Sequence, residues 1–227
     1  MSLALPSAAR FRTKQEFVYR TLRDAIMRCE LAPGQRLVID DLARQLEVSA
    51  IPVREAIQTL QSEGLVQTVP HVGASVSPIS RESIDEVFTV MEGLEIVATR
   101  EAASRLRPDD AAELQAMLGA MDEALGGGAY EKWSELNSRF HLAISAITGM
   151  SLLRDMTQRV LGQWDRVRRH YFEGVLVPRA DTAQREHHEL VAAMQARDLA
   201  RLETIVRTHN RGALGDYSEF IRRHEAP

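Results

Sequence analysis

The chain has 227 residues, a formal net charge of −4 and a single cysteine, Cys29. This length is enough for two ordinary domains with buried cores, while one cysteine excludes an intrachain disulfide and fits a reducing cytosol. No apolar run is long enough to span a membrane, so we expect a cytoplasmic protein. Residues 1–78 carry nine Lys and Arg against eight Asp and Glu, and the remainder is acidic, so charge alone does not indicate DNA binding.

The first third of the chain predicts a small domain at 13–77, preceded by a flexible arm at 1–12. Pro and Gly mark a turn at 31–35. Around Pro70 and Gly73, two short apolar runs predict a β-hairpin. The predicted elements are helices at 13–29, 40–46 and 50–63, a short strand at 36–38, and hairpin strands at 65–69 and 74–77.

The helices at 40–46 and 50–63 are joined by a turn of only three residues, 47–49. We expect the Ser49 hydroxyl to cap the second of them and Pro52 to be tolerated in its first turn. Two short helices joined so tightly predict a helix-turn-helix, whose second helix enters a DNA major groove. The spacing predicts an inner face of Val53, Ala56, Ile57 and Leu60, and an outer face that includes Ala50, Arg54 and Gln58.

The stretch from 32 to 76 resembles the winged-helix domain of GntR-type bacterial transcription regulators. The resemblance rests on PGQRL at 33–37, PVREAI at 52–57 and EGLV at 63–66, followed by PHVG at the wing. It implies a homodimer that reads a palindromic operator in double-stranded DNA. Ala50 and Val72 stand where many members carry a basic residue, which implies a different operator or weaker binding. The implied DNA contacts are Arg36, Arg44, Ala50, Arg54, Gln58, His71 and Gly73. The alternative interpretation for Arg44 and His71 is that they are solvated surface residues.

Beyond a linker at 78–80, residues 81–224 show helical periodicity and no strand pattern. We therefore predict a mainly α protein, in which a winged helix-turn-helix with three helices and a hairpin wing is followed by an all-α six-helix bundle. The predicted bundle helices are 80–106, 108 to the glycines at 126–128, 130–148, 151–173, 181–196 and 198–222, with Pro178 separating the fourth from the fifth.

Three histidines interrupt apolar helix faces in this half. His187 lies 11 residues before Asp198 and His209 lies 11 after it. If the chain turns near Asp198, antiparallel helices place both rings at one level, about 16 Å from the turn. His141, with Asn137 one turn earlier, can approach from a third helix.

Three imidazoles and one oxygen form a suitable shell for a divalent ion such as zinc or nickel. The spacing therefore predicts a metal site of Asn137, His141, His187 and His209. The alternative from the same spacing is that each histidine is a hydrogen-bonded core residue.

The helical half also resembles the ligand-binding FCD domain of the FadR subfamily of GntR regulators. NSRFH at 137–141, REHHELVAAMQARD at 185–198 and His209 match its metal-binding branch, although Asn137 stands where an Asp is usual. The resemblance implies a small anionic metabolite as effector, such as an organic acid, and repression relieved by it. Met91, in place of a frequent Arg, and Glu95 are the implied effector-lining residues.

Two alternatives remain for this half: a regulator whose effector pocket holds no metal, and a metal-dependent hydrolase. The second requires a general base beside the histidines, for which Glu186 and Glu189 are the candidates. The sequence favours a regulator that is not an enzyme.

Overall fold

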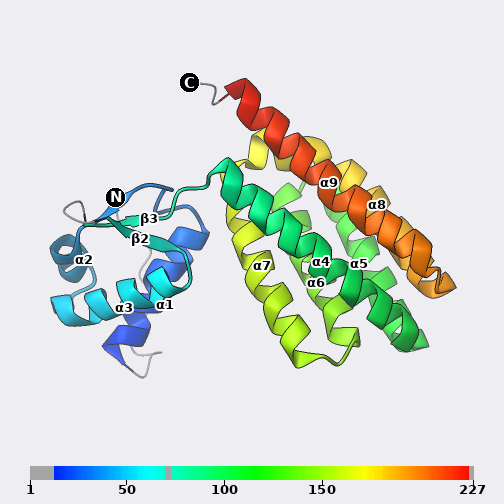
Figure 1. The fold of residues 1–227 in the computed structure, drawn as a ribbon, viewed down its shortest axis with the longest axis horizontal. Helices are drawn as coiled ribbons and strands as arrows, with labels where there is room; N and C mark the ends of the chain where they lie inside the picture. Colours follow the sequence, from blue (N-terminus) through cyan, green and yellow to red (C-terminus); the bar gives the residue numbers. More distant parts are fainter. Residues whose placement is uncertain (1–12, 70–72, 225–227) are drawn as a thin grey trace. The chain divides into compact units, whose positions relative to one another are not determined.

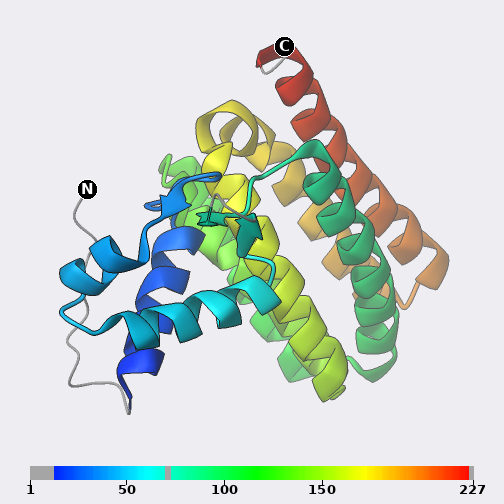
Figure 2. The same cartoon turned by 60° about the vertical axis from the view of Figure 1, so that its left-hand side comes forward.

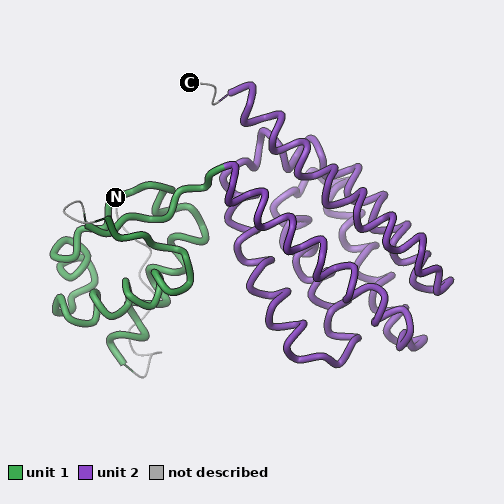
Figure 3. Tube along the Cα trace, viewed as in Figure 1, with its two compact units in different colours: residues 1–80 green, residues 81–227 purple. Residues whose placement is uncertain are grey.

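In the computed structural model, residues 13–69 and 73–224 are described. The chain divides into two compact units, the first ending at Ser80 and the second beginning at Arg81 (Figure 3). His71 and Val72 lie outside the described residues. None of the described helices is both long and apolar enough to cross a membrane.

The first unit contains three helices and a small sheet (Figure 1). Thr13 caps the first helix by accepting a hydrogen bond from the Glu16 N–H at 3.0 Å. The strand order is β1-β3-β2, with both pairings antiparallel. The elements are α1 (Lys14–Met27), β1 (Arg36–Leu37), α2 (Ile39–Gln45), α3 (Ala50–Ser62), β2 (Val66–Val69) and β3 (Gly73–Val76).

The inner face predicted for α3 is confirmed, since all four of its apolar residues are buried. Ser49 occupies the N-cap position of α3, but its side chain makes no capping hydrogen bond. This detail of the sequence prediction is wrong: Ser49 is exposed, so water can satisfy the free N–H groups. Glu47 turns the chain between α2 and α3 with a left-handed φ of 54°.

The second unit is a helical bundle in which α4 packs against α9, α5 against α6, and α8 against α9 (Figures 1 and 2). The mainly α prediction, with a winged helix-turn-helix followed by six α-helices, is confirmed for the described residues. The elements are α4 (Arg81–Arg105), α5 (Pro108–Gly126), α6 (Tyr130–Ile147), α7 (Ser151–His170), η2 (Phe172–Leu176), α8 (Val177–Ala196) and α9 (Leu199–His224).

Two details of the predicted bundle are corrected between α7 and α8. α7 ends at His170, and a π-helical turn, η2, leads directly into α8. Pro178 does not separate two helices but lies in the first turn of α8, where its missing N–H costs nothing. At the other end of α8, Arg197 turns the chain with a φ of 54°, and the Asp198 carboxylate accepts a hydrogen bond from the Arg201 N–H at 3.0 Å.

Candidate functional site

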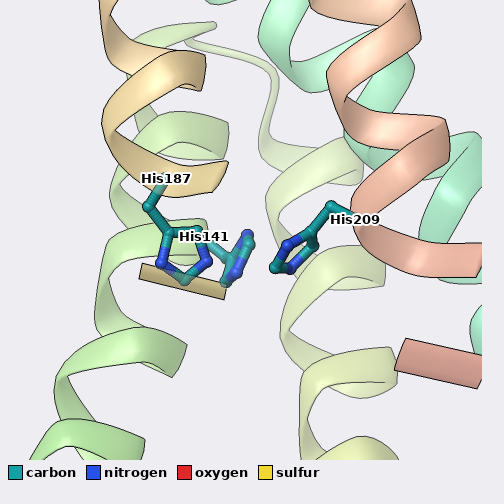
Figure 4. Close-up of side chains that lie close together, drawn as sticks. All are labelled: His141, His187 and His209. Atoms are coloured by element: carbon teal, nitrogen blue, oxygen red, sulfur yellow. The ribbon is translucent and has the colours of Figure 1, made fainter. Parts of the chain in front are cut away.

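Three histidines from three helices meet inside the second unit. His141 from α6, His187 from α8 and His209 from α9 each offer one ring nitrogen, and these atoms all lie within 4.8 Å of one another. Figure 4 shows the three rings converging. The ring centroids of His187 and His209 are 4.9 Å apart, so the two helices bring these residues to the same level. His141 and His187 are buried, and His209 is partly buried.

Two carboxylates hold the outer nitrogens of two of these rings. Nδ1 of His141 lies 2.7 Å from Glu95 Oε1, and Nδ1 of His209 lies 2.7 Å from Glu186 Oε2. An imidazole that donates from Nδ1 keeps a lone pair on Nε2. Carboxylates in this position orient metal-ligating histidines and raise their basicity.

Gln184 contacts the Nδ1 atom of the third ring, His187, as the carboxylates do for the other two rings. Its Oε1 lies 3.4 Å from Nδ1 of His187 and accepts a hydrogen bond from Trp133 Nε1 at 3.1 Å. Its Nε2 donates to the Leu118 carbonyl at 3.2 Å and to Asp122 Oδ1 at 2.7 Å. These partners fix which end of the amide faces His187. Gln184 therefore orients that ring without adding a charge.

Two polar atoms at the histidine cluster lack hydrogen-bond partners. Asn137 Oδ1 and His187 Nε2 are both buried and make no hydrogen bond. Asn137, Met91 and Glu95 line the same pocket as His141 and His209. Buried polar atoms without partners are uncommon, and an amide oxygen with three imidazole nitrogens matches the donors that a divalent transition metal prefers. The residues present therefore fit such an ion.

Two ionisable groups at the histidine cluster have shifted pKa values. Burial opposes ionisation of Glu95, but His141, His209 and Asn210 outweigh it and lower its pKa to about 2. Burial, followed by the neighbouring His209 and His141, lowers the pKa of His187 well below its ordinary value. These directions keep Glu95 ionised and His187 neutral.

Arg179 is a pocket residue that the sequence reading did not identify. It lines the pocket on α8, donates to Glu186 Oε2 and Asp216 Oδ2 at 3.0 Å each, and also donates to the His209 carbonyl at 3.0 Å. Its side chain is 12% exposed. The sequence signal for Arg179 is its spacing: it lies one helical turn before Ala183 and two turns before Glu186, so all three share one face of the helix.

The residues predicted to contact DNA lie on exposed parts of the first unit. Arg54 and Gln58 of α3 are exposed, and Ala50 is partly exposed. Arg36 on β1 and Gly73 at the start of β3 are also exposed. Gly73 has a φ of 99°, a conformation that favours glycine.

Arg44 on α2 is exposed and lies 3.1 Å from Asp41, in an ion pair too exposed to hold the side chain firmly. His71, also predicted to contact DNA, lies outside the described residues.

Residues 14–76 match the family described as bacterial regulatory proteins, gntR family, and residues 86–212 match the FCD domain. The two matches cover most of the chain. The chain belongs to the gntR family of bacterial regulatory proteins. It is a helix-turn-helix transcription regulator with an FCD domain, and the recognition made on the sequence is confirmed.

The similarity between this gntR-family chain and known transcription regulators covers most of both chains. It is 33% identical over 174 residues to the HTH-type transcriptional regulator McbR of Escherichia coli, covering 74% of this chain and 76% of that protein. It is 29% identical to the HTH-type transcriptional repressor RspR of E. coli, covering 91% and 88%. The solved structure of E. coli McbR/YncC superimposes with a TM-score of 0.73 at 25% identity, covering 92% of this chain and 100% of that one.

The two carboxylates considered as general bases for a hydrolase have different surroundings in this gntR-family protein. Glu186 is engaged by His209 and Arg179, and Glu189 is exposed. The family and the relatives instead indicate a DNA-binding regulator.

Proposed function

We propose that this gntR-family regulator is a homodimeric repressor whose helical unit holds a divalent transition metal, zinc or nickel, and binds a small anionic metabolite there. The observation that carries the metal is the orientation of the three histidines. The Nδ1 atom of each ring has one partner: Glu95 for His141, Gln184 for His187 and Glu186 for His209. The buried Nε2 of His187 has no partner. In a histidine cluster that serves only packing, each buried ring nitrogen usually has a hydrogen-bond partner.

His141, His187 and His209 would supply Nε2 donors, and Asn137 would supply Oδ1. The ion would offer positive charge and open coordination positions to an anionic ligand. Arg179 adds a fixed cation on the same pocket wall. Metal and guanidinium together favour an organic acid over a neutral ligand.

On the DNA side, α3 would enter the major groove with Arg54 as the main reader. A guanidinium can pair with both acceptors of a guanine, and Gln58 can pair with an adenine. Arg36 and Arg44 would contact phosphates, while Gly73 would allow the wing backbone to approach the duplex. Ala50 lies on the same helix but contributes no charge.

A ligand shifts an equilibrium between two arrangements of a dimer only if it binds one of them more tightly. Effector binding would therefore weaken operator binding if the effector favours the arrangement in which the two α3 helices do not fit the operator. The repressor RspR among the relatives supports repression as the basal activity.

The DNA part is tested by selecting duplexes from a random-sequence pool with the full-length protein. Wild type should enrich a palindrome that the Arg54→Ala variant does not bind specifically. Arg105→Ala removes an exposed arginine from the other unit and should behave as wild type. Equal binding by Arg54→Ala and wild type would contradict the assigned role of α3.

The metal part is tested on neighbouring histidines. His187→Ala should lower zinc or nickel affinity by more than about a hundredfold, because a ligand is lost. His188→Ala should leave affinity unchanged, since His188 is exposed and contacts Asp122 instead. Freshly purified wild type that holds no metal, and is not stabilised by added zinc or nickel, would favour the metal-free pocket.

A further inference from the structure

Ile51 is an exposed aliphatic residue at the start of the recognition helix. It is the second residue of α3 and is 67% exposed. The apolar residues that hold α3 in place, including Val53 and Leu60, are fully buried on the opposite side. Ile51 therefore contributes little to the core of the first unit.

Helical geometry places Ile51 with the polar readers. At 100° per residue, Ile51 and Gln58 point within about 20° of each other, and Arg54 lies about 60° to one side. All three are exposed. Ile51 precedes the other two, and residues near the N-terminus of a recognition helix are those that reach base edges.

An aliphatic side chain cannot form hydrogen bonds with bases. The one apolar group that base pairs present in the major groove is the C5-methyl of thymine. We propose that Ile51 is a specificity-determining residue that reads a thymine in each half-site by packing against this methyl group. The inference rests on the proposed function, because it requires α3 to enter the major groove.

The folded protein alone gives no reason for isoleucine at this position. Alanine is the better helix former, and leaving a large aliphatic group in water gains nothing. Ile51→Ala should therefore leave the fold intact while removing the surface that would contact the methyl group. This separates a DNA-reading role from a structural one.

The test replaces thymine by uracil in the duplex that full-length wild type selects from the random pool. Uracil lacks only the C5-methyl group, so base pairing and hydrogen-bonding atoms are preserved. Each thymine is replaced in turn, symmetrically in both half-sites. Affinities are measured for wild type, Ile51→Ala and the control Leu199→Ala, which trims an aliphatic residue that is 42% exposed in the other unit.

At one thymine position, wild type and Leu199→Ala should bind the uracil duplex about fourfold more weakly per half-site, the change expected for losing one buried methyl group. Ile51→Ala should bind the thymine duplex more weakly and should be insensitive to uracil at that position.

Specific binding with no position at which the uracil effect depends on Ile51 overturns the inference and leaves the proposed function standing. Failure of wild type to select any duplex contradicts the proposed function itself, and the inference falls with it.

Discussion

Asn137 is the one neutral oxygen donor in a set otherwise made of imidazoles. Its Oδ1 is buried and unpartnered on the wall that also holds His141. The negative charge near the proposed ion comes instead from Glu95 and Glu186, which contact the imidazoles of His141 and His209.

The Asn137→Asp variant should bind zinc or nickel at least about tenfold more tightly, because a carboxylate is a stronger ligand than an amide oxygen. Without metal the same variant should melt at a lower temperature, since a further carboxylate is buried without a partner. Competition with a chromophoric chelator and thermal melts with and without metal measure both effects. Unchanged metal affinity would show that Oδ1 of residue 137 does not bind the ion.

The sequence indicated the ligands because they follow simple helical arithmetic: i and i+4 for Asn137 and His141, and equal distances from Asp198 for the other two. Two of the orienting residues follow no such rule. Glu95 reaches His141, and Glu186 reaches His209, only because different helices pack together, whereas Gln184 lies three residues before His187 on the same helix. The sequence reading accordingly placed Glu95 in the effector pocket without its hydrogen bond to His141, and it missed Gln184 and Arg179.

At the scale of elements, η2 fits closely against α9. A Cβ atom at Gly174 would lie 2.2 Å from Phe220 Cε2. The Phe220 ring packs on Tyr171, with centroids 5.8 Å apart, and stacks on His224 at 4.1 Å. These contacts limit how far the ring can move aside, and η2 also supplies Val175 and Leu176 to the pocket.

Gly174→Ala should lower the free energy of unfolding by about 1–3 kcal/mol through overpacking. The matched control is Gly119→Ala inside α5, where a Cβ meets no atom within 4 Å. That variant should gain roughly 0.5–1 kcal/mol, because alanine favours the helix. Urea denaturation measures both, and two variants of equal stability would contradict the close packing of η2.

The contact between α4 and α9 includes an ion-pair cluster. Glu92 on α4 lies 2.6 Å from Arg207 and 3.0 Å from Arg211, both on α9. Hydrogen bonding from Arg211 lowers the pKa of Glu92, partial burial opposes it, and the charges of Arg211 and Arg207 add to the lowering. The ionised carboxylate therefore stabilises the folded state at and above its ordinary pKa, and this stabilisation is lost as the pH falls toward the lowered value.

Replacing Glu92 by Gln should thus destabilise the protein at neutral pH by at most about 1 kcal/mol, given that both arginines are partly exposed. The difference from wild type should shrink as the pH falls below the ordinary pKa of glutamate toward the lowered pKa of Glu92, because wild-type Glu92 then becomes protonated. Glu86→Gln, at an exposed position on the same helix, serves as the control. A pH-independent difference between Glu92→Gln and wild type would rule out this ionic contribution.

At the scale of the whole molecule, the proposal requires two copies of the chain on one operator. A dimer with a twofold axis presents two copies of α3, and a palindromic site presents two matching half-sites. Each single unit then binds with modest affinity, and the linked second contact supplies most of the strength.

The full-length protein should bind the selected palindrome at least about a hundredfold more tightly than a duplex with one half-site scrambled. Sedimentation should show two chains on each palindrome. The comparison is made at one fixed salt concentration, because phosphate contacts make affinity salt-dependent. Equal affinity for the two duplexes, with one chain bound to each, would exclude a dimeric reader.

The sequence by itself determined the helices, the wing, the family and the histidines that share helix faces, because each depends on local periodicity or on short motifs. Tertiary structure alone decided which carboxylates orient His141 and His209, since Glu95 and Glu186 act through contacts between different helices. It also decided that Ile51 is exposed and that Arg179 lines the pocket, because solvent exposure and pocket position depend on neighbours distant in the chain.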